Sequence, residues 1–194
     1  MNEMNYYMPI VVDNEGRQER AYDLPSRLLK DRIILLQGEV NDAMASIICA
    51  EVLFLAAEDK KKPIKVYINS PGGSVTAGLS IYDCLRTCGC IIETYALGQA
   101  CSMGAWLFAA GTKGHRTCLE SARIMIHQVL GGYSGQATDI RIHYEETQRI
   151  KEFLTRKLAE FTGKDYQEVY DACERDNFMS AQESLEFGLC DKIL

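Results

Sequence analysis

The chain has 194 residues, of which 47% are hydrophobic and 25% charged, and its net charge is −6. This length and composition are typical of one globular domain with a sizeable core, and the negative charge argues against nucleic acid or an anionic membrane as the main partner. No apolar run approaches the ~20 residues that cross a bilayer. The N-terminal residues also lack the cationic and apolar regions of a secretory signal, so we expect a cytoplasmic protein.

Hydrophobic periodicity and punctuation by glycine and proline predict alternating helices and strands after a polar, irregular segment over residues 1–20. The early elements are a helix over 24–30, a strand over 32–36, a helix that starts at Asn41 or Asp42 and ends before the charged turn 58–62, and a strand over 64–68. Next come a helix over 76–87, a strand over 91–97, about two helical turns between Ser102 and Gly111, and strands over 116–119 and 122–126. The last predicted elements are a helix over 137–161, which Gly163 ends, and a helix over 166–173.

This alternation predicts an α/β fold with a largely parallel sheet and right-handed crossovers. The strands read as continuous apolar runs, which is typical of a sheet covered by helices on its faces. The helix over 137–161 is too long for a small globule at ~1.5 Å per residue. We expect it to project and pack against another subunit.

The stretch from Gly98 to Ala105 places a serine, Ser102, between small residues and before an apolar helix. At a helix N-terminus, free N–H groups and the helix dipole stabilise an alkoxide or an oxyanion. Two alternatives stand beside a nucleophilic Ser102. The serine is a favoured N-cap residue, and the adjacent Cys101 is a second potential nucleophile.

A serine nucleophile requires a base, and the chain has three histidines. His115 lies in a polar turn and His143 lies inside the long helix, where both are expected to be solvated. His127 follows the apolar strand that ends at Ile126 and is the best-placed candidate. An isolated histidine at that place is also compatible with a structural role in the core.

The candidates for the acid that orients the base are Asp139, Asp171, Asp176 and Asp191. Of these, Asp176 lies at a predicted junction between a helix and a loop. A serine–histidine–aspartate order differs from the orders of α/β-hydrolases, subtilisins and chymotrypsins. The serine also lacks the first glycine of the G-x-S-x-G motif. These three enzyme classes are therefore disfavoured.

The loop from Asn69 to Ser74 contains Gly72 and Gly73 but lacks the Lys-Ser/Thr ending of a phosphate-binding loop. Its glycines would instead let a backbone N–H approach a reacting carbonyl. The eight cysteines are expected to be reduced, since several lie in apolar runs. Cys84, Cys88 and Cys90 lack the paired spacing of a metal site, and no metal is predicted.

Several motifs, in order along the chain, resemble those of the proteolytic subunits of Clp proteases, the ClpP family. They are Ser26 to Ile34, Tyr67 to Gly73, Ser102 to Ala105, Met125 to Gln128, Gly135 to Ile140, and Arg175 to Ala181. The resemblance runs from about Arg20 to the C-terminus. It implies a single peptidase domain over 1–194 with a crotonase-like fold, a flexible axial segment over 1–20, and a projecting handle helix within a handle region over 128–162.

The resemblance also implies a serine endopeptidase with Ser102 as nucleophile, His127 as base and Asp176 as the acid that fixes the histidine tautomer. Gly73 and Met103 match the positions whose N–H groups form the family's oxyanion hole. The family needs no cofactor in this subunit, because ATP is used by the partner.

In the family, two stacked heptameric rings enclose the active sites, and an AAA+ unfoldase such as ClpX, ClpA or ClpC delivers unfolded proteins. Tyr67 and Tyr82 match the docking surface, and Gly131, Gly132 and Arg175 match contacts between rings. Gln99, Cys101 and the segment from Cys84 to Cys90 depart from the usual residues, which affects partner choice more than chemistry. Two other functions remain open, a non-catalytic ring subunit and an acyl-CoA enzyme of the crotonase type.

Overall fold

The computed structural model describes residues 9–15 and 18–194. The helices are α1 (Leu24–Lys30), α2 (Asp42–Glu58), α3 (Val75–Thr87), α4 (Met103–Ala109), α5 (Ala137–Thr162), α6 (Tyr166–Ala172) and α7 (Ala181–Phe187). The strands are β1 (Ile10–Glu15), β2 (Gln18–Asp23), β3 (Ile33–Gln37), β4 (Ile64–Ser70), β5 (Ile92–Cys101), β6 (Arg116–Cys118), β7 (Arg123–Ile126), β8 (Asn177–Met179) and β9 (Lys192–Ile193).

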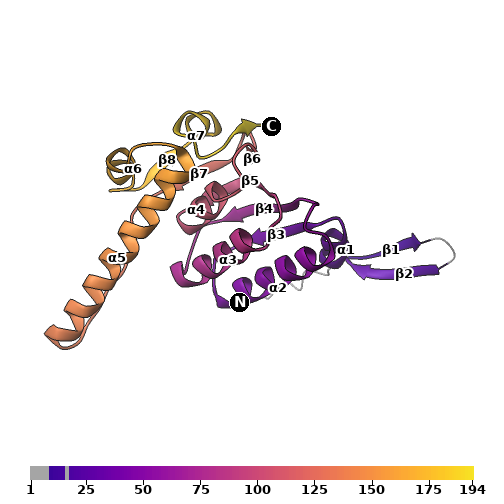
Figure 1. Cartoon of the computed structure of the whole chain (residues 1–194), viewed down its shortest axis with the longest axis horizontal. Coiled ribbons are helices and arrows are strands. Elements are labelled where there is room, and N and C mark those ends of the chain that lie inside the picture. The colour runs from indigo at the N-terminus through magenta and orange to yellow at the C-terminus, as the bar shows by residue number, and fades with distance from the viewer. Residues whose placement is uncertain (1–8, 16–17) are drawn as a thin grey trace, which may run out of the picture.

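The main sheet of the described residues has seven strands and is parallel except where β8 joins it. Strands β3, β4, β5, β6 and β9 follow one another in that order. Besides β4, the long strand β5 pairs with two further strands. Its first half pairs with β6, and its last residues, Gln99–Cys101, pair with β7. Helices α2 and α3 lie side by side in front of β3 and β4 (Figure 1). This is the predicted α/β fold with a largely parallel sheet.

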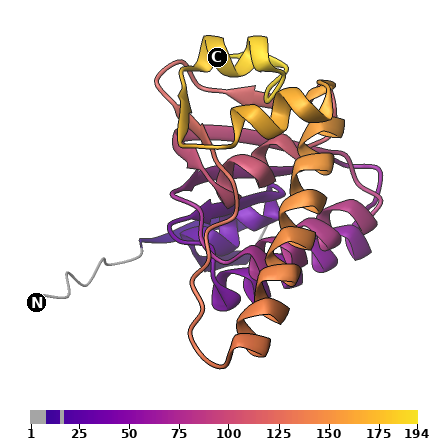
Figure 2. The ribbon, with the colours of Figure 1, turned by 90° about the vertical axis from the view of Figure 1, so that its left-hand side faces the viewer.

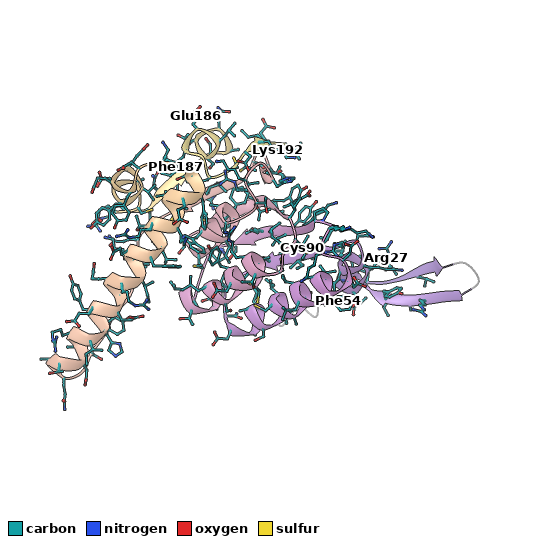
Figure 3. The ribbon with its side chains drawn as sticks, in the orientation of Figure 1. Arg27, Phe54, Cys90, Glu186, Phe187 and Lys192 are labelled. Atoms are coloured by element: carbon teal, nitrogen blue, oxygen red, sulfur yellow. The ribbon has the colours of Figure 1, made fainter. Side chains whose placement is uncertain are left out.

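Helix α2 is apolar around its whole circumference and therefore leaves large side chains in solvent. Asn41 caps it by accepting a hydrogen bond from the N–H of Met44 at 2.9 Å. Its inner face is buried, but Ile47, Leu53 and Phe54 are 60%, 60% and 53% exposed. Phe54 lies on the outer side of the helix (Figure 3). A helix that is apolar all round is normally buried on both sides, so this face is suited to contact with another chain.

Helix α5 packs on the body only near its C-terminal end. Its buried residues are Thr155, Leu158 and Thr162, whereas the first half extends away from the sheet (Figure 1). Its 26 residues correspond to about 39 Å. The segment between β7 and α5 runs alongside the helix, so that together they form an arm (Figure 2). The predicted projection of this helix agrees with the structure, and Gly163 ends it with φ 77°.

Two parts of the chain differ from the prediction. The expectation of an irregular segment over 1–20 is wrong for Ile10–Glu15, which pairs with β2 as an antiparallel hairpin; residues 1–8 and 16–17 lie outside the described residues. Ile10 and Val12 share one face of the strand and are 71% and 61% exposed, so that face gives no buried, alternating pattern. The chain after residue 173 also contains β8, α7 and β9, which the sequence analysis did not predict.

Among the described residues, no helix is both long enough and apolar enough to cross a membrane.

Candidate active site

Ser102 occupies the tight turn between β5 and α4. Its backbone has φ 55° and ψ −123°, a conformation that is rare and costly for a residue with a side chain. The Ser102 N–H donates to the carbonyl of Met125 at 2.7 Å, which ties the turn to β7. All seven residues of α4 are buried. The strained turn is therefore held between the sheet and the core.

The Ser102 hydroxyl does not cap α4, although the residue is at the N-cap position. Its Oγ instead lies 2.7 Å from Nε2 of His127. The interpretation of Ser102 as a simple capping serine is therefore wrong for its side chain.

His127 and Asp176 come together through the register of the only antiparallel pair in the described main sheet. Ile126 pairs with Asn177 at the end of the β7–β8 ladder. In an antiparallel ladder the next opposed pair is His127 and Asp176, and Nδ1 of His127 lies 3.2 Å from Oδ1 of Asp176. If Nδ1–H donates to this carboxylate, Nε2 is left as the acceptor for the Ser102 hydroxyl proton.

The other two histidines lie away from Ser102. Nδ1 of His115 is 3.7 Å from Oε1 of Glu93. The ring of His143 stacks on Tyr133, with the two centroids 4.5 Å apart. Both placements agree with the choice of His127.

The other candidate acids are also engaged elsewhere. Asp171 accepts a hydrogen bond from Nε2 of Gln167 at 2.8 Å, and Asp191 accepts one from Nη2 of Arg116 at 2.6 Å. Asp139 lies in the first turn of α5 and is exposed. Of the four acids, Asp176 is the one that contacts His127.

Cys101 is not positioned as the nucleophile. Its side chain is directed to Gln99, with Sγ 3.7 Å from Oε1. Burial raises the pKa of the Cys101 thiol, which lowers the fraction of reactive thiolate.

Gly73 and Met103 line the same cavity as Ser102, and their backbone N–H groups have no acceptor within the described part of the chain. Met103 is the first residue of α4, so its N–H has no intrahelical partner. Gly73 forms a parallel bridge with Val40. This bridge uses the carbonyl of Gly72 and the N–H of Ser74, so the N–H of Gly73 points away from Val40.

A cavity of about 300 Å³ opens beside Ser102 and His127. Its wall is mainly apolar and includes Val75, Trp106, Leu130, Leu154 and Leu158. Helix α4 is fastened to α5 at this wall, because Nε1 of Trp106 donates to the carbonyl of Leu154 at 3.1 Å. The sequence analysis did not predict this wall, which also includes Lys151 and Cys173.

The residues that the resemblance assigns to docking and to ring contacts differ from one another in their exposure. Tyr67 is half-buried and stacks on Tyr95, with ring centroids 4.6 Å apart. Tyr82 is only 7% exposed and packs edge-on against Trp106. The assignment of Tyr82 to a docking surface is corrected, because its ring belongs to the core.

Gly131, Gly132 and Arg175 are all exposed. The two glycines lie in the segment that leads into α5, and a methyl group at position 132 would meet no atom within 4 Å. Space at Gly132 is therefore available to a neighbouring chain.

The family model of the Clp proteases matches residues 16–194. The chain belongs to the Clp protease family. The match covers the whole main sheet and all three residues of the Ser102–His127–Asp176 cluster. Membership of this family makes the chain a peptidase subunit.

Proposed function

We propose that this chain is a serine endopeptidase in which Ser102, His127 and Asp176 act as a catalytic triad. The observation that carries the proposal is the continuous contact from Ser102 Oγ to His127 Nε2, at 2.7 Å, and from His127 Nδ1 to Asp176 Oδ1, at 3.2 Å. His127 takes the hydroxyl proton as Ser102 attacks the scissile carbonyl and returns it to the leaving amine. Asp176 fixes the tautomer and stabilises the imidazolium.

The N–H groups of Gly73 and Met103 form the oxyanion hole in this proposal. Both residues line the cavity beside Ser102, and their N–H groups lack other acceptors in the described structure. Preorganised donors of this kind stabilise the charge that develops on the tetrahedral intermediate. Gly73 is required at its position because its φ is 147° and any Cβ would collide with the backbone of Val40.

The substrate in this proposal is an extended peptide that lies beside Gly73 and the segment after His127, held mainly by backbone hydrogen bonds. The side chain before the cleaved bond enters the apolar cavity beside Ser102. Recognition of main chain together with an apolar pocket favours broad specificity for unfolded chains.

The assembly and partners in this proposal are those that the Clp protease family implies, and the exposed apolar surfaces are compatible with them. We expect two stacked heptameric rings, with the arm of residues 128–162 between rings and the outer face of α2 against a neighbour. An AAA+ unfoldase would dock near Tyr67 and supply unfolded substrate. All eight cysteines are free thiols, which fits a reducing compartment such as the cytoplasm.

The experiment that tests the proposed chemistry is labelling with a fluorophosphonate probe, followed by identification of the modified residue. The wild-type chain is expected to be labelled at Ser102, and Ser102→Ala is expected to be unlabelled. Cys101→Ala is the matched control and should be labelled normally. Absence of label on the assembled wild-type protein would favour a non-catalytic ring subunit.

A further inference from the structure

Lys151 is an almost buried cation close to the triad. It lies on α5 in the cavity wall, and its side chain is 11% exposed. Its Nζ donates to Gln128 Oε1 at 3.0 Å and to Tyr170 OH at 3.1 Å, and it lies 3.4 Å from Glu174 Oε2. Nζ also sits 4.2 Å from the centroid of the Tyr170 ring.

Two of these partners flank the triad residues in sequence. Gln128 directly follows His127, and Glu174 precedes Asp176 by two positions. Gln128 also joins the two segments directly, because its Nε2 donates to the carbonyl of Glu174 at 2.9 Å. Lys151, Gln128 and Glu174 therefore form a closed set of contacts, which we call the Lys151 clamp.

The clamp lies where backbone pairing ends. The β7–β8 ladder stops at Ile126 and Asn177, one pair before His127 and Asp176. The side chain of Asp176 is 62% exposed, so packing contributes little to its position. Beyond the ladder, the described side-chain contacts that join the two segments are the His127–Asp176 contact itself and the clamp.

We propose that Lys151 is a positioning residue for this peptidase, which holds the segments carrying His127 and Asp176 at the separation that aligns the triad. The inference rests on the proposed function, since it presupposes that these two residues act together. It adds a role for α5, because the helix that forms the arm also supplies the group that aligns the acid with the base.

Lys151 is not available to bind substrate. An ammonium group has three donors, and Gln128, Tyr170 and Glu174 account for all three. Burial lowers the pKa of Lys151, but the hydrogen bonds to Tyr170 and Glu174 outweigh it and leave the pKa above its ordinary value. The group therefore stays charged and engaged within the clamp.

The test is a double-mutant cycle between Lys151→Met and Asp176→Asn in the full, assembled protein. Methionine keeps an unbranched stem in the cavity wall and removes the charge and the donors. We expect Lys151→Met to lower kcat for a short fluorogenic peptide about tenfold with KM within about twofold. In the Asp176→Asn background, followed at high enzyme concentration, the further loss should be under about twofold, because the aligned acid is already absent.

Lys157→Met is the matched control, because Lys157 lies on the same helix and pairs only with the exposed Glu160 among the described contacts. It should leave kcat unchanged. Gln128→Ala removes the bridge without altering α5 and should reproduce the kcat loss, so the proposal stays testable if Lys151→Met does not assemble.

The positioning role would be overturned if Lys151→Met lowered kcat by the same factor in the wild-type and the Asp176→Asn backgrounds. It would also be overturned if neither Lys151→Met nor Gln128→Ala lowered kcat. These outcomes are distinct from failure of the proposed function. That failure would appear as absence of fluorophosphonate label at Ser102 in the wild-type protein, whatever the cycle shows.

Discussion

The two halves of the Ser102–His127–Asp176 cluster are held by different parts of the fold. Ser102 is fixed by backbone, between β5 and a helix whose residues are all buried, and its N–H is bonded to β7. The His127–Asp176 pair lies just beyond the last backbone pair of a short ladder, and the Asp176 side chain is 62% exposed. The proposed nucleophile is thus held by the core, whereas alignment of the proposed acid and base depends on a few side-chain contacts near the surface.

Removal of His127, which links the two halves through its two ring nitrogens, should have the largest effect. We expect His127→Ala to lower kcat for peptide hydrolysis on the order of 10⁶-fold, because the serine then lacks its base. His115→Ala is the control, since that ring contacts Glu93 instead, and it should retain nearly full activity. Comparable losses in both variants would contradict the assignment of the base.

The exposed half is broken selectively by Asp176→Asn. The amide has the shape of the carboxylate but does not stabilise the imidazolium, so we expect a loss in kcat of up to about 10⁴-fold. The loss should be smaller than that of His127→Ala because the site of Asp176 is open to water, which can accept the hydrogen bond from His127 in place of the carboxylate. Asp171→Asn, at an acid that contacts Gln167, should leave kcat unchanged, and an equal effect of both substitutions would remove Asp176 from the triad.

The buried half is broken by Gly72→Ala, in the loop between β4 and α3. A methyl group at position 72 would lie 2.6 Å from Cβ of Ser102, and displacement of a nucleophile by about 1 Å costs on the order of 10²-fold in rate. We expect kcat to fall by that factor while circular dichroism shows retained helix and strand.

Gly38→Ala separates this clash from backbone strain. Gly38 has φ +88°, close to the +96° of Gly72, but a methyl group there meets nothing within 4 Å. It should lower the melting temperature without lowering kcat at temperatures where the protein is folded. An equal loss of kcat at both positions would mean that strain alone explains the Gly72 effect.

The smallest effect on activity is expected far from both halves, at the ion pair between Arg116 and Asp191. Arg116 is 1% exposed and its Nη2 lies 2.6 Å from Asp191 Oδ1. Asp191→Asn leaves a buried guanidinium without its counter-charge, which costs about 3–5 kcal/mol of folding free energy. Denaturant unfolding at neutral pH should show this loss, while kcat of the folded protein is unchanged.

The same pair gives a pH dependence with a definite sign. Burial raises the pKa of Asp191, but hydrogen bonds from Arg116 and Gly114 outweigh it, so the pKa is below its ordinary 3.8 in the folded state. The stabilisation is therefore complete above the unfolded pKa and is lost as the pH falls through the folded pKa. The gap in stability between wild type and Asp191→Asn should narrow on acidification below about pH 4; a constant gap would contradict the shift.

Much of the fold could be predicted from local patterns, because most elements carry a buried face or a clear end signal. Asn41 and Gly163 cap their helices as expected. The β1–β2 hairpin lacked such a pattern, since Ile10 and Val12 are exposed and none of its residues with a described burial is buried. Helix α7 did have a signal, the capping box of Ser180 and Glu183, which the sequence analysis did not use.

The site was predictable in its members but not in its geometry. The motifs around Ser102, His127 and Asp176 identified the three residues, whereas their meeting depends on the register of β8, a strand of three residues that is too short to show a period. Lys151 lies next to the apolar positions Ile150 and Leu154 of α5 and gives no pattern of its own. Tyr82 carried a motif match, but only the packing around Trp106 shows that it is internal.

The position of β8 has a consequence for the synthesis of this protein. The ribosome makes the chain from the N-terminus, so the strands that carry Ser102 and His127 emerge long before Asn177–Met179. Until β8 pairs with β7, the nascent chain contains the proposed nucleophile and base without the proposed acid aligned beside them. Under the proposed function, the chain therefore gains hydrolytic competence only after Asn177–Met179 has been synthesised and has paired with β7.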